Sequence, residues 1–418
     1  MINFIQRLRE NRYVWQIVTL MSGTLIAQII MFAFIPILTR LYTPAEFGTY
    51  SLFFSLASML GMVSSWKYDQ AIMLPKSERY AQSLVFLSIL ITLGMVLVTV
   101  AVLVIFYSFF LDYFHGMEYL IWLLPFSILI IGLLQIFDSY SNRCQFYKKM
   151  ASVKVATSIA TVGTQTVSRY GFGLNGLIAG KVFADMFGLF LLIRFHLKKQ
   201  TLQLKWLTKR NLKAGLKRHD HFPKYQSFSV LINSFSQNLP LLLFPTLFSP
   251  AIAGFYALTY RVLQAPILLI ANSTKKVYYQ KASKMYAEGK KIHELYSKTT
   301  FGLLKLFILP LFITLFWGEE IFSFVFGNQW REAGVIAQVA IFVFLFSFIT
   351  PPATMNYSIL NLQKTQLKLQ IFQFILRFAG IFIGYLFFDS YMIAIVLFVL
   401  AGVAVNSFLI IYMYYKLK

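Results

Sequence analysis

Five charged side chains lie well inside the long apolar stretches of the sequence, away from their ends, where a charge is costly. Four of them are cations, Lys181, Arg261, Lys305 and Arg377, and the fifth is Asp185. A charged side chain at membrane depth costs about 2.5–3.5 kcal/mol on insertion scales, and it usually faces a cavity or a partner. Four cations against one acid leave an excess of positive charge. We therefore predict a cationic cavity that suits an anionic ligand, and a pyrophosphate would fit.

Several of these residues also have a purely structural explanation. Lys181 and Asp185 are four residues apart, so they can pair on one face of a helix. Asp185 is the one acid in these stretches, which makes it the candidate for ion coupling. Lys305 can extend to the inner membrane surface, whereas Arg261 lies too deep to do so easily. Arg40 follows the first stretch and is either a further contact for the anion or an interface anchor.

Uncharged polar side chains form a second group in or beside the apolar stretches. Sugar hydroxyls need such donors and acceptors, together with aromatic rings on which to stack. Hydrogen bonds between membrane helices use the same residue types, and for any single residue this structural role is favoured. The group comprises Gln28, Asn233, Gln237, Asn238, Gln264, Asn356, Gln370 and Gln373.

The sequence offers no constellation for catalysis. All five His lie outside the apolar stretches, and the single Cys144 excludes a disulfide framework and a Cys-based metal site. There is no Walker loop, so ATP hydrolysis is not expected as the driving force. We predict that the protein is not an enzyme and that it has no cofactor and no metal site.

The elements that position these residues are membrane helices. The chain is 58% hydrophobic and only 13% charged, with a mean hydropathy of +0.67. Globular chains are about one quarter charged, so lipid must cover most of this surface. A span needs about 20 apolar residues. Such stretches predict an all-α membrane protein with about twelve transmembrane helices, near 14–38, 47–66, 82–111, 119–137, 151–168, 174–195, 227–248, 252–271, 299–317, 333–351, 371–388 and 391–415.

The charges between the stretches predict the orientation. With the N-terminus inside, external segments hold 3 of the 38 Lys and Arg residues, and cytosolic segments hold 31. This bias follows the positive-inside rule and places both termini in the cytosol. The net charge of +23 therefore reflects the membrane surface, and we expect no nucleic-acid partner.

A short repeat suggests that the chain consists of two parallel halves. Residues 43–50 and 249–256 share Pro, Ala, Gly and Tyr at a constant offset of 206. Since six helices separate the copies, orientation is preserved, as in transporters that handle substrate between two halves. We predict a six-helix half over 1–195, a linker over 196–226 and a second six-helix half over 227–418. The linker is basic and amphipathic and should lie on anionic lipid, or else dock a cytosolic partner.

Three segments resemble bacterial polysaccharide flippases of the exporter superfamily that includes the MATE drug transporters. Residues 38–48 (LTRLYTPAEFG) are similar to the opening hairpin of that family, and residues 67–75 (KYDQAIMLP) to the stretch after its second helix. The middle segment runs from Phe222-Pro223-Lys224-Tyr225 to Val277-Tyr278-Tyr279-Gln280. One departure is residues 272–276 (NSTKK), where the family more often has small apolar residues and a Gln. This departure bears on the fine specificity of the protein and not on its resemblance to the family.

The resemblance implies a transporter of undecaprenyl-diphosphate-linked oligosaccharide repeat units, for O-antigen, capsule or exopolysaccharide. It implies flipping from the cytosolic to the outer leaflet of the bacterial cytoplasmic membrane, beside polymerase and glycosyltransferase machinery. On this hypothesis Arg261, Lys181, Arg377, Lys305 and Arg40 would contact the anionic cargo. The alternatives are a MATE-type drug or ion antiporter, a lipid II flippase, which usually carries two further helices, and a membrane polymerase or ligase.

Overall fold

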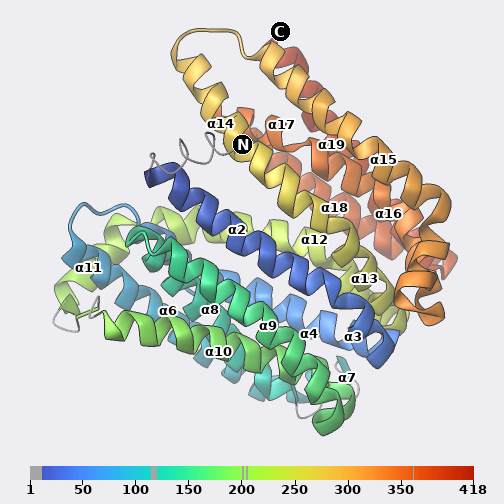
Figure 1. Cartoon of the computed structure of the whole chain (residues 1–418), viewed down its shortest axis with the longest axis horizontal. Helices are drawn as coiled ribbons and strands as arrows, with labels where there is room; N and C mark the ends of the chain where they lie inside the picture. The colour runs from blue at the N-terminus through green and yellow to red at the C-terminus, as the bar shows by residue number, and fades with distance from the viewer. Residues whose placement is uncertain (1–11, 114–119, 200–201, 204–205, 361) are drawn as a thin grey trace, which may run out of the picture. The chain divides into compact units, whose positions relative to one another are not determined.

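The residues that the structure, a computed structural model, describes are nearly all helical (Figure 1). These are residues 12–113, 120–199, 202–203, 206–360 and 362–418. They fold into two compact units. The first comprises Met1–Leu41 and Leu52–Leu231, and the second comprises Tyr42–Ser51 and Ile232–Lys418. The predicted division into two halves and a separate linker stays a prediction.

In the first unit, successive helices pack in the order α2, α9, α10, α8 and α6. Small residues allow the close approach of α9 and α10, since a Cβ on Gly180 would lie 2.6 Å from the backbone nitrogen of Gln165. The unit contains α2 (Arg12–Ala33), α3 (Ile35–Leu41), most of α4 (Pro44–Val63), α5 (Tyr68–Ala71), α6 (Glu78–Ile105), α7 (Tyr107–Tyr113), α8 (Leu123–Arg143), α9 (Tyr147–Phe172), α10 (Gly176–Lys198) and α11 (Lys209–Arg218).

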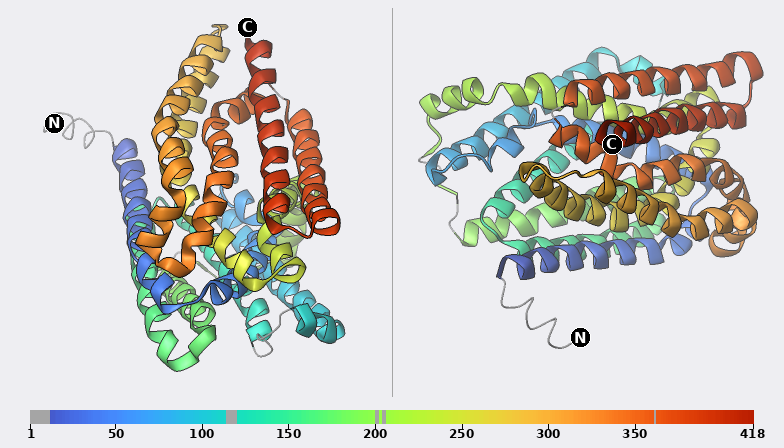
Figure 2. Two further views of the ribbon diagram at one scale, coloured as in Figure 1. Left: turned by 90° about the vertical axis from the view of Figure 1, so that its right-hand side faces the viewer. Right: turned by 90° about the horizontal axis from the view of Figure 1, so that it is seen from above.

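In the second unit, the corresponding helices pack in the same order. Helices α18, α19, α16 and α15 follow one another side by side (Figure 2), and α12 reaches α18 through the Ser236–Arg377 contact. This shared order is the arrangement expected of two parallel repeats. The helices are α12 (Phe228–Leu247), α13 (Pro250–Pro266), α14 (Asn272–Ala287), α15 (His293–Phe326), α16 (Arg331–Ile349), α17 (Pro351–Ile359), α18 (Gln363–Phe388) and α19 (Tyr391–Leu417).

Two helical runs extend furthest beyond the apolar stretches that predicted them. Helix α13 continues through a π-helical segment, Ile267–Ala271, into α14, so the run extends to Ala287 where the predicted span ends at residue 271. Helix α15 spans 34 residues, with a kink at Trp317, where the predicted span covers 299–317. A cluster of polar residues ends an apolar stretch but leaves backbone hydrogen bonding intact. Helix ends therefore lie beyond the predicted membrane boundaries.

Eight helices of the described chain are long and apolar enough to cross a membrane by length and composition. The other four predicted spans, 47–66, 151–168, 227–248 and 252–271, are largely helical in the structure, as α4, α9, α12 and α13. Helix α9 carries many Ser and Thr residues, and α13 is only 17 residues long. The count of twelve membrane helices stays a prediction.

The two copies of the sequence repeat touch each other within the second unit. A Cβ on Gly48 would lie 1.7 Å from the carbonyl oxygen of Pro250, and a Cβ on Gly254 would lie 1.8 Å from that of Pro44. The first turns of α4 and α13 therefore cross with their backbones in direct contact, which only glycine permits. The buried ring of Trp330 packs against both helices, with its centroid 5.0 Å from Phe47 and 6.1 Å from Phe255.

Candidate functional site

A polar cavity of about 390 Å³ lies within the second unit. Helices α12, α13, α14, α16, α17, α18 and α19 all contribute to its wall. The charged residues of the lining are Arg377 and Lys275, both cations, and no Asp or Glu of the described chain takes part. A cavity of this composition favours an anionic or neutral polar ligand and disfavours a cation.

Arg377 is buried at this cavity and has no counter-ion among the described residues. It is 6% exposed, and its Nη1 donates to Ser236 Oγ at 3.2 Å. Its guanidinium carbon lies 4.7 Å from the ring centroid of Phe398. In the described part of the chain no carboxylate forms an ion pair with it, and its buried Nε has no hydrogen-bond partner. Because an uncompensated buried charge is strongly unfavourable, an anion in the cavity would stabilise this arrangement.

Helix α18 presents a ladder of polar side chains to the cavity. Gln366, Gln370, Gln373 and Arg377 recur at intervals of four, three and four residues, which places them on one helix face. The three Gln side chains and Asn406 of α19, also in the lining, form no side-chain hydrogen bond with other described residues. Their donors and acceptors are therefore available to a ligand.

The α13–α14 run carries a second lining face, with Tyr256, Tyr260, Gln264 and Lys275. Lys275 was not predicted as a site residue. It lies in residues 272–276, the segment that departs from the family pattern, and this departure was the signal that could have identified it. Gln366 was missed because it falls in a predicted cytosolic loop, and Asn406 because it is isolated in a strongly apolar helix.

Some of the predicted amides line the cavity, and others form hydrogen bonds within the protein. Asn233, Gln237, Gln264, Gln370 and Gln373 line the cavity. By contrast, buried Asn356 pairs with Tyr278, whose hydroxyl lies 3.0 Å from Asn356 Oδ1, and Asn238 donates to the Ser234 carbonyl oxygen at 2.8 Å. These two amides therefore have a structural hydrogen-bonding role, which the sequence analysis favoured for any single amide.

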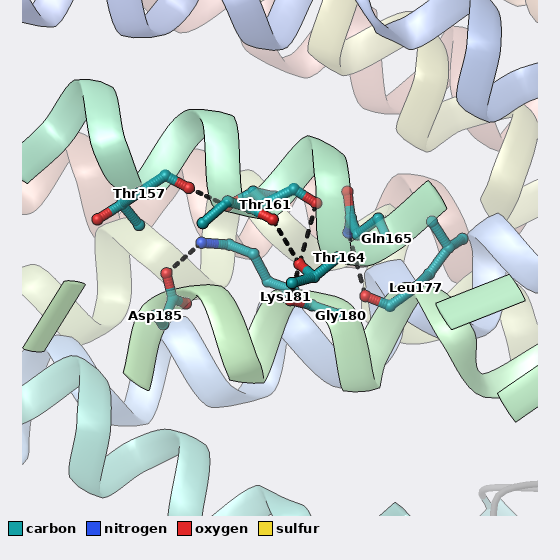
Figure 3. Close-up of polar contacts among 9 residues, drawn as sticks. Thr157, Thr161, Thr164, Gln165, Leu177, Gly180, Lys181 and Asp185 are labelled. Atoms are coloured by element: carbon teal, nitrogen blue, oxygen red, sulfur yellow. Dashed lines mark hydrogen bonds and ion pairs between the residues drawn. The ribbon is translucent and has the colours of Figure 1, made fainter. Parts of the chain in front are cut away.

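Lys181 and Asp185 lie in the first unit, where they form an ion pair on α10 (Figure 3). The Lys181 ammonium also lies 5.3 Å from the ring centroid of Phe54. Beside the pair, the α9 side chains bond to the α10 backbone: Thr164 Oγ1 donates to the Gly180 carbonyl oxygen at 2.6 Å, as Figure 3 shows. The four-residue spacing therefore corresponds to a real pair. Its role in cargo binding or ion coupling stays a prediction.

The remaining predicted cations lie away from the cavity wall. Arg261 is half-buried on α13, directly after Tyr260, and does not belong to the lining. Lys305 is exposed on α15 beside a shallow hollow that also includes Lys298. Arg40 is exposed near the end of α3, in the first unit. Of the five predicted cations, the structure places Arg377 in this cavity, and a cargo contact by the other four stays a prediction.

A metal site has no candidate in the described ranges, since no group of three or more His, Cys, Asp or Glu residues converges there. The predicted absence of a cofactor stays a prediction.

Comparison with known proteins identifies the family. A family model described as "Polysaccharide biosynthesis protein" matches residues 37–335. The capsular polysaccharide biosynthesis protein CapF of Staphylococcus aureus is 22% identical over 335 residues, which cover 78% of this chain and 80% of CapF.

Solved structures of similar fold are membrane transporters. An inward-facing multidrug resistance MATE family transporter of the MOP superfamily matches with a TM-score of 0.73 and 13% identity, over 95% of this chain and 94% of that one. The lipid II flippase MurJ in an inward closed conformation matches with a TM-score of 0.71 and 13% identity, over 97% of this chain and 90% of that one. The predicted all-helical, MATE-like membrane fold is thus confirmed. The chain belongs to the polysaccharide biosynthesis protein family, as its motifs predicted, and it shares the fold of a MATE family transporter and of the lipid II flippase MurJ.

Proposed function

We propose that the protein flips undecaprenyl-diphosphate-linked oligosaccharide repeat units from the cytosolic to the outer leaflet by alternating access of its two halves. The observation that carries the proposal is the carboxylate-free cavity with the buried, unpaired cation Arg377. Its amide and hydroxyl lining offers hydrogen bonds to sugars, and its positive charge attracts an anionic cargo. The hydrocarbon tail of such a cargo would stay in the bilayer.

The relatives support the same cargo class. CapF is named for capsular polysaccharide biosynthesis, and MurJ is named a lipid II flippase. A protein with this role would reside in the bacterial cytoplasmic membrane with both termini in the cytosol. It would act beside the glycosyltransferases and the polymerase of an O-antigen, capsule or exopolysaccharide pathway.

A MATE-type drug antiporter is the alternative that the fold leaves open. Cationic drugs need carboxylates in the binding cavity, and this lining has none among the described residues. The charge of the cavity therefore favours the lipid-linked saccharide over the cationic drug.

The proposal is tested with Arg377→Ala in a strain that lacks the chromosomal gene. We expect surface polysaccharide to fall about tenfold or more at matched protein level, because the variant removes the cavity's buried cation. Arg261→Ala is a second variant and should also lower the output if Arg261 contacts cargo during transport.

Lys284→Ala is the matched control, since the Lys284 side chain is 79% exposed and lies on α14 outside the lining. It should leave the surface polysaccharide unchanged. Wild-type output from Arg377→Ala would contradict the assignment of this cavity to the cargo.

A further inference from the structure

The two cations of the cavity lie far apart. The Phe398 ring contacts both the Arg377 guanidinium, at 4.7 Å, and the Tyr256 ring, with centroids 6.3 Å apart, so these groups share one end of the cavity. Lys275 follows Tyr256 by 19 residues along the α13–α14 run, about 28 Å at 1.5 Å per helical residue. Arg377 and Lys275 therefore cannot grip the same phosphate group.

The cavity wall between the two cations carries polar side chains that can bind an elongated polar ligand. On α18, the ladder from Arg377 to Gln366 covers eleven residues, about 16 Å along the helix. Gln366, Gln370, Gln373 and Asn406 have no side-chain hydrogen bonds to other described residues. A ligand with hydroxyls along its length would satisfy these donors and acceptors, as a short oligosaccharide does.

The Arg377 end is suited to one negative charge. The guanidinium has a single positive charge and is nearly fully buried, its Nη1 is bonded to Ser236, and its buried Nε has no hydrogen-bond partner among the described residues. A planar carboxylate matches the fork geometry of Arg and neutralises its charge. A pyrophosphate carries more negative charge than one buried cation can balance, whereas at the half-buried Lys275 solvent can share the excess charge.

We propose that the cavity holds the saccharide lengthwise, with the carboxylate of an acidic sugar on Arg377 and the lipid-proximal pyrophosphate toward Lys275. This inference rests on the proposed function and names its cargo class, a repeat unit with a carboxylated sugar. By the predicted topology, Lys275 is the cation of the cytosolic end, where a lipid-linked pyrophosphate would enter.

The test compares two cargoes in proteoliposomes that contain the full-length protein. One is an undecaprenyl-diphosphate-linked oligosaccharide that ends in a hexuronic acid, and the other is the same molecule with the carboxyl group reduced to an alcohol. We expect the wild type to flip the acidic cargo about tenfold or more faster at limiting concentration, as one charge-assisted contact implies. Arg377→Gln should abolish this preference, so that the variant flips the acidic and the reduced cargo at the same rate.

Lys275→Gln should slow both cargoes equally, and Lys281→Gln, at an exposed position of the same helix, should slow neither. Arg377→Lys keeps the charge without the fork and should give an intermediate preference. Equal flipping of both cargoes by the wild type, or an equal loss of both in Arg377→Gln, would overturn the carboxylate assignment. Failure of the wild type to flip either cargo would instead refute the proposed function. If Arg377→Gln does not fold, the wild-type comparison still decides.

Discussion

At the scale of single residues, the charges within the membrane helices have two different environments. Lys181 and Asp185 neutralise each other on α10, whereas Arg377 is buried without a carboxylate. In the sequence, the Lys181–Asp185 pair and Arg377 are both identified as functional candidates by the same rule, that charge in an apolar stretch is costly. It does not distinguish them, because a counter-ion can also come from a helix that is distant in sequence. For Arg377 the structure supplies a serine and an aromatic ring in place of that counter-ion.

The proposed coupling role of Asp185 gives a prediction at this scale. In proteoliposomes, we expect the double variant Lys181→Met, Asp185→Leu to lose any acceleration of flipping by a proton or sodium gradient, because it has no ionisable acid at this site. Flipping without a gradient should persist, since the two apolar side chains replace a neutral pair. The measurement is the flipping rate with and without each gradient.

Undiminished gradient acceleration in the double variant would contradict the coupling role and leave the pair as a structural element. The matched control is the single variant Lys181→Met. It leaves Asp185 in place without its partner and should retain a gradient response with a changed pH dependence.

At the scale of helices, the boundaries and contacts follow the sequence unevenly. Each predicted apolar stretch overlaps a helix of the structure. The stretches do not predict the continuation of α13 into α14 or the full length of α15. Arg377 and several amides of the cavity were predicted, whereas the α18 ladder as a whole was not, because the face of α18 that points inward depends on the packing of α12, α13 and α19. Lys275 was missed for the same reason.

The backbone crossing of α4 and α13 gives a prediction about stability. We expect Gly254→Ala to destabilise the protein by about 1–3 kcal/mol, because the new Cβ would lie 1.8 Å from the Pro44 carbonyl oxygen and the two helices must separate. The measurement is thermal unfolding of the detergent-solubilised protein.

Gly94→Ala serves as its control, since a Cβ on Gly94 in α6 has no neighbour within 4 Å in the described structure. This variant should unfold like the wild type. An equal shift in both variants would mean that the crossing contributes nothing beyond the general effect of replacing a glycine.

At the scale of the whole molecule, the two units repeat one order of helix packing, α9–α10–α8–α6 in the first and α18–α19–α16–α15 in the second. The short Pro-Ala-Gly-Tyr repeat is consistent with this shared order, and the division of the chain into two repeated halves stays a prediction. In the described part of the chain, eight helices meet the length and hydropathy criteria for a span. The orientation of the chain rests on the positive-inside rule alone.

Cysteine accessibility tests that orientation. After Cys144→Ser, a cysteine placed by Glu320→Cys should react with a membrane-impermeant thiol reagent in intact cells, because the topology puts it outside. A cysteine placed by Lys213→Cys should react only after permeabilisation. Both replaced side chains are exposed, so protein burial does not confound the comparison. The reverse pattern would invert the topology.

The flipping activity itself is tested most directly in proteoliposomes loaded with a labelled undecaprenyl-diphosphate-linked oligosaccharide that ends in a hexuronic acid. A membrane-impermeant oxidant of sugars, added outside, reports the fraction of cargo in the outer leaflet over time. We expect wild-type protein to bring the initially protected fraction to the oxidant, and Arg377→Ala to do so about tenfold or more slowly. Protected cargo that stays protected with the wild-type protein, as in protein-free liposomes, would contradict the account.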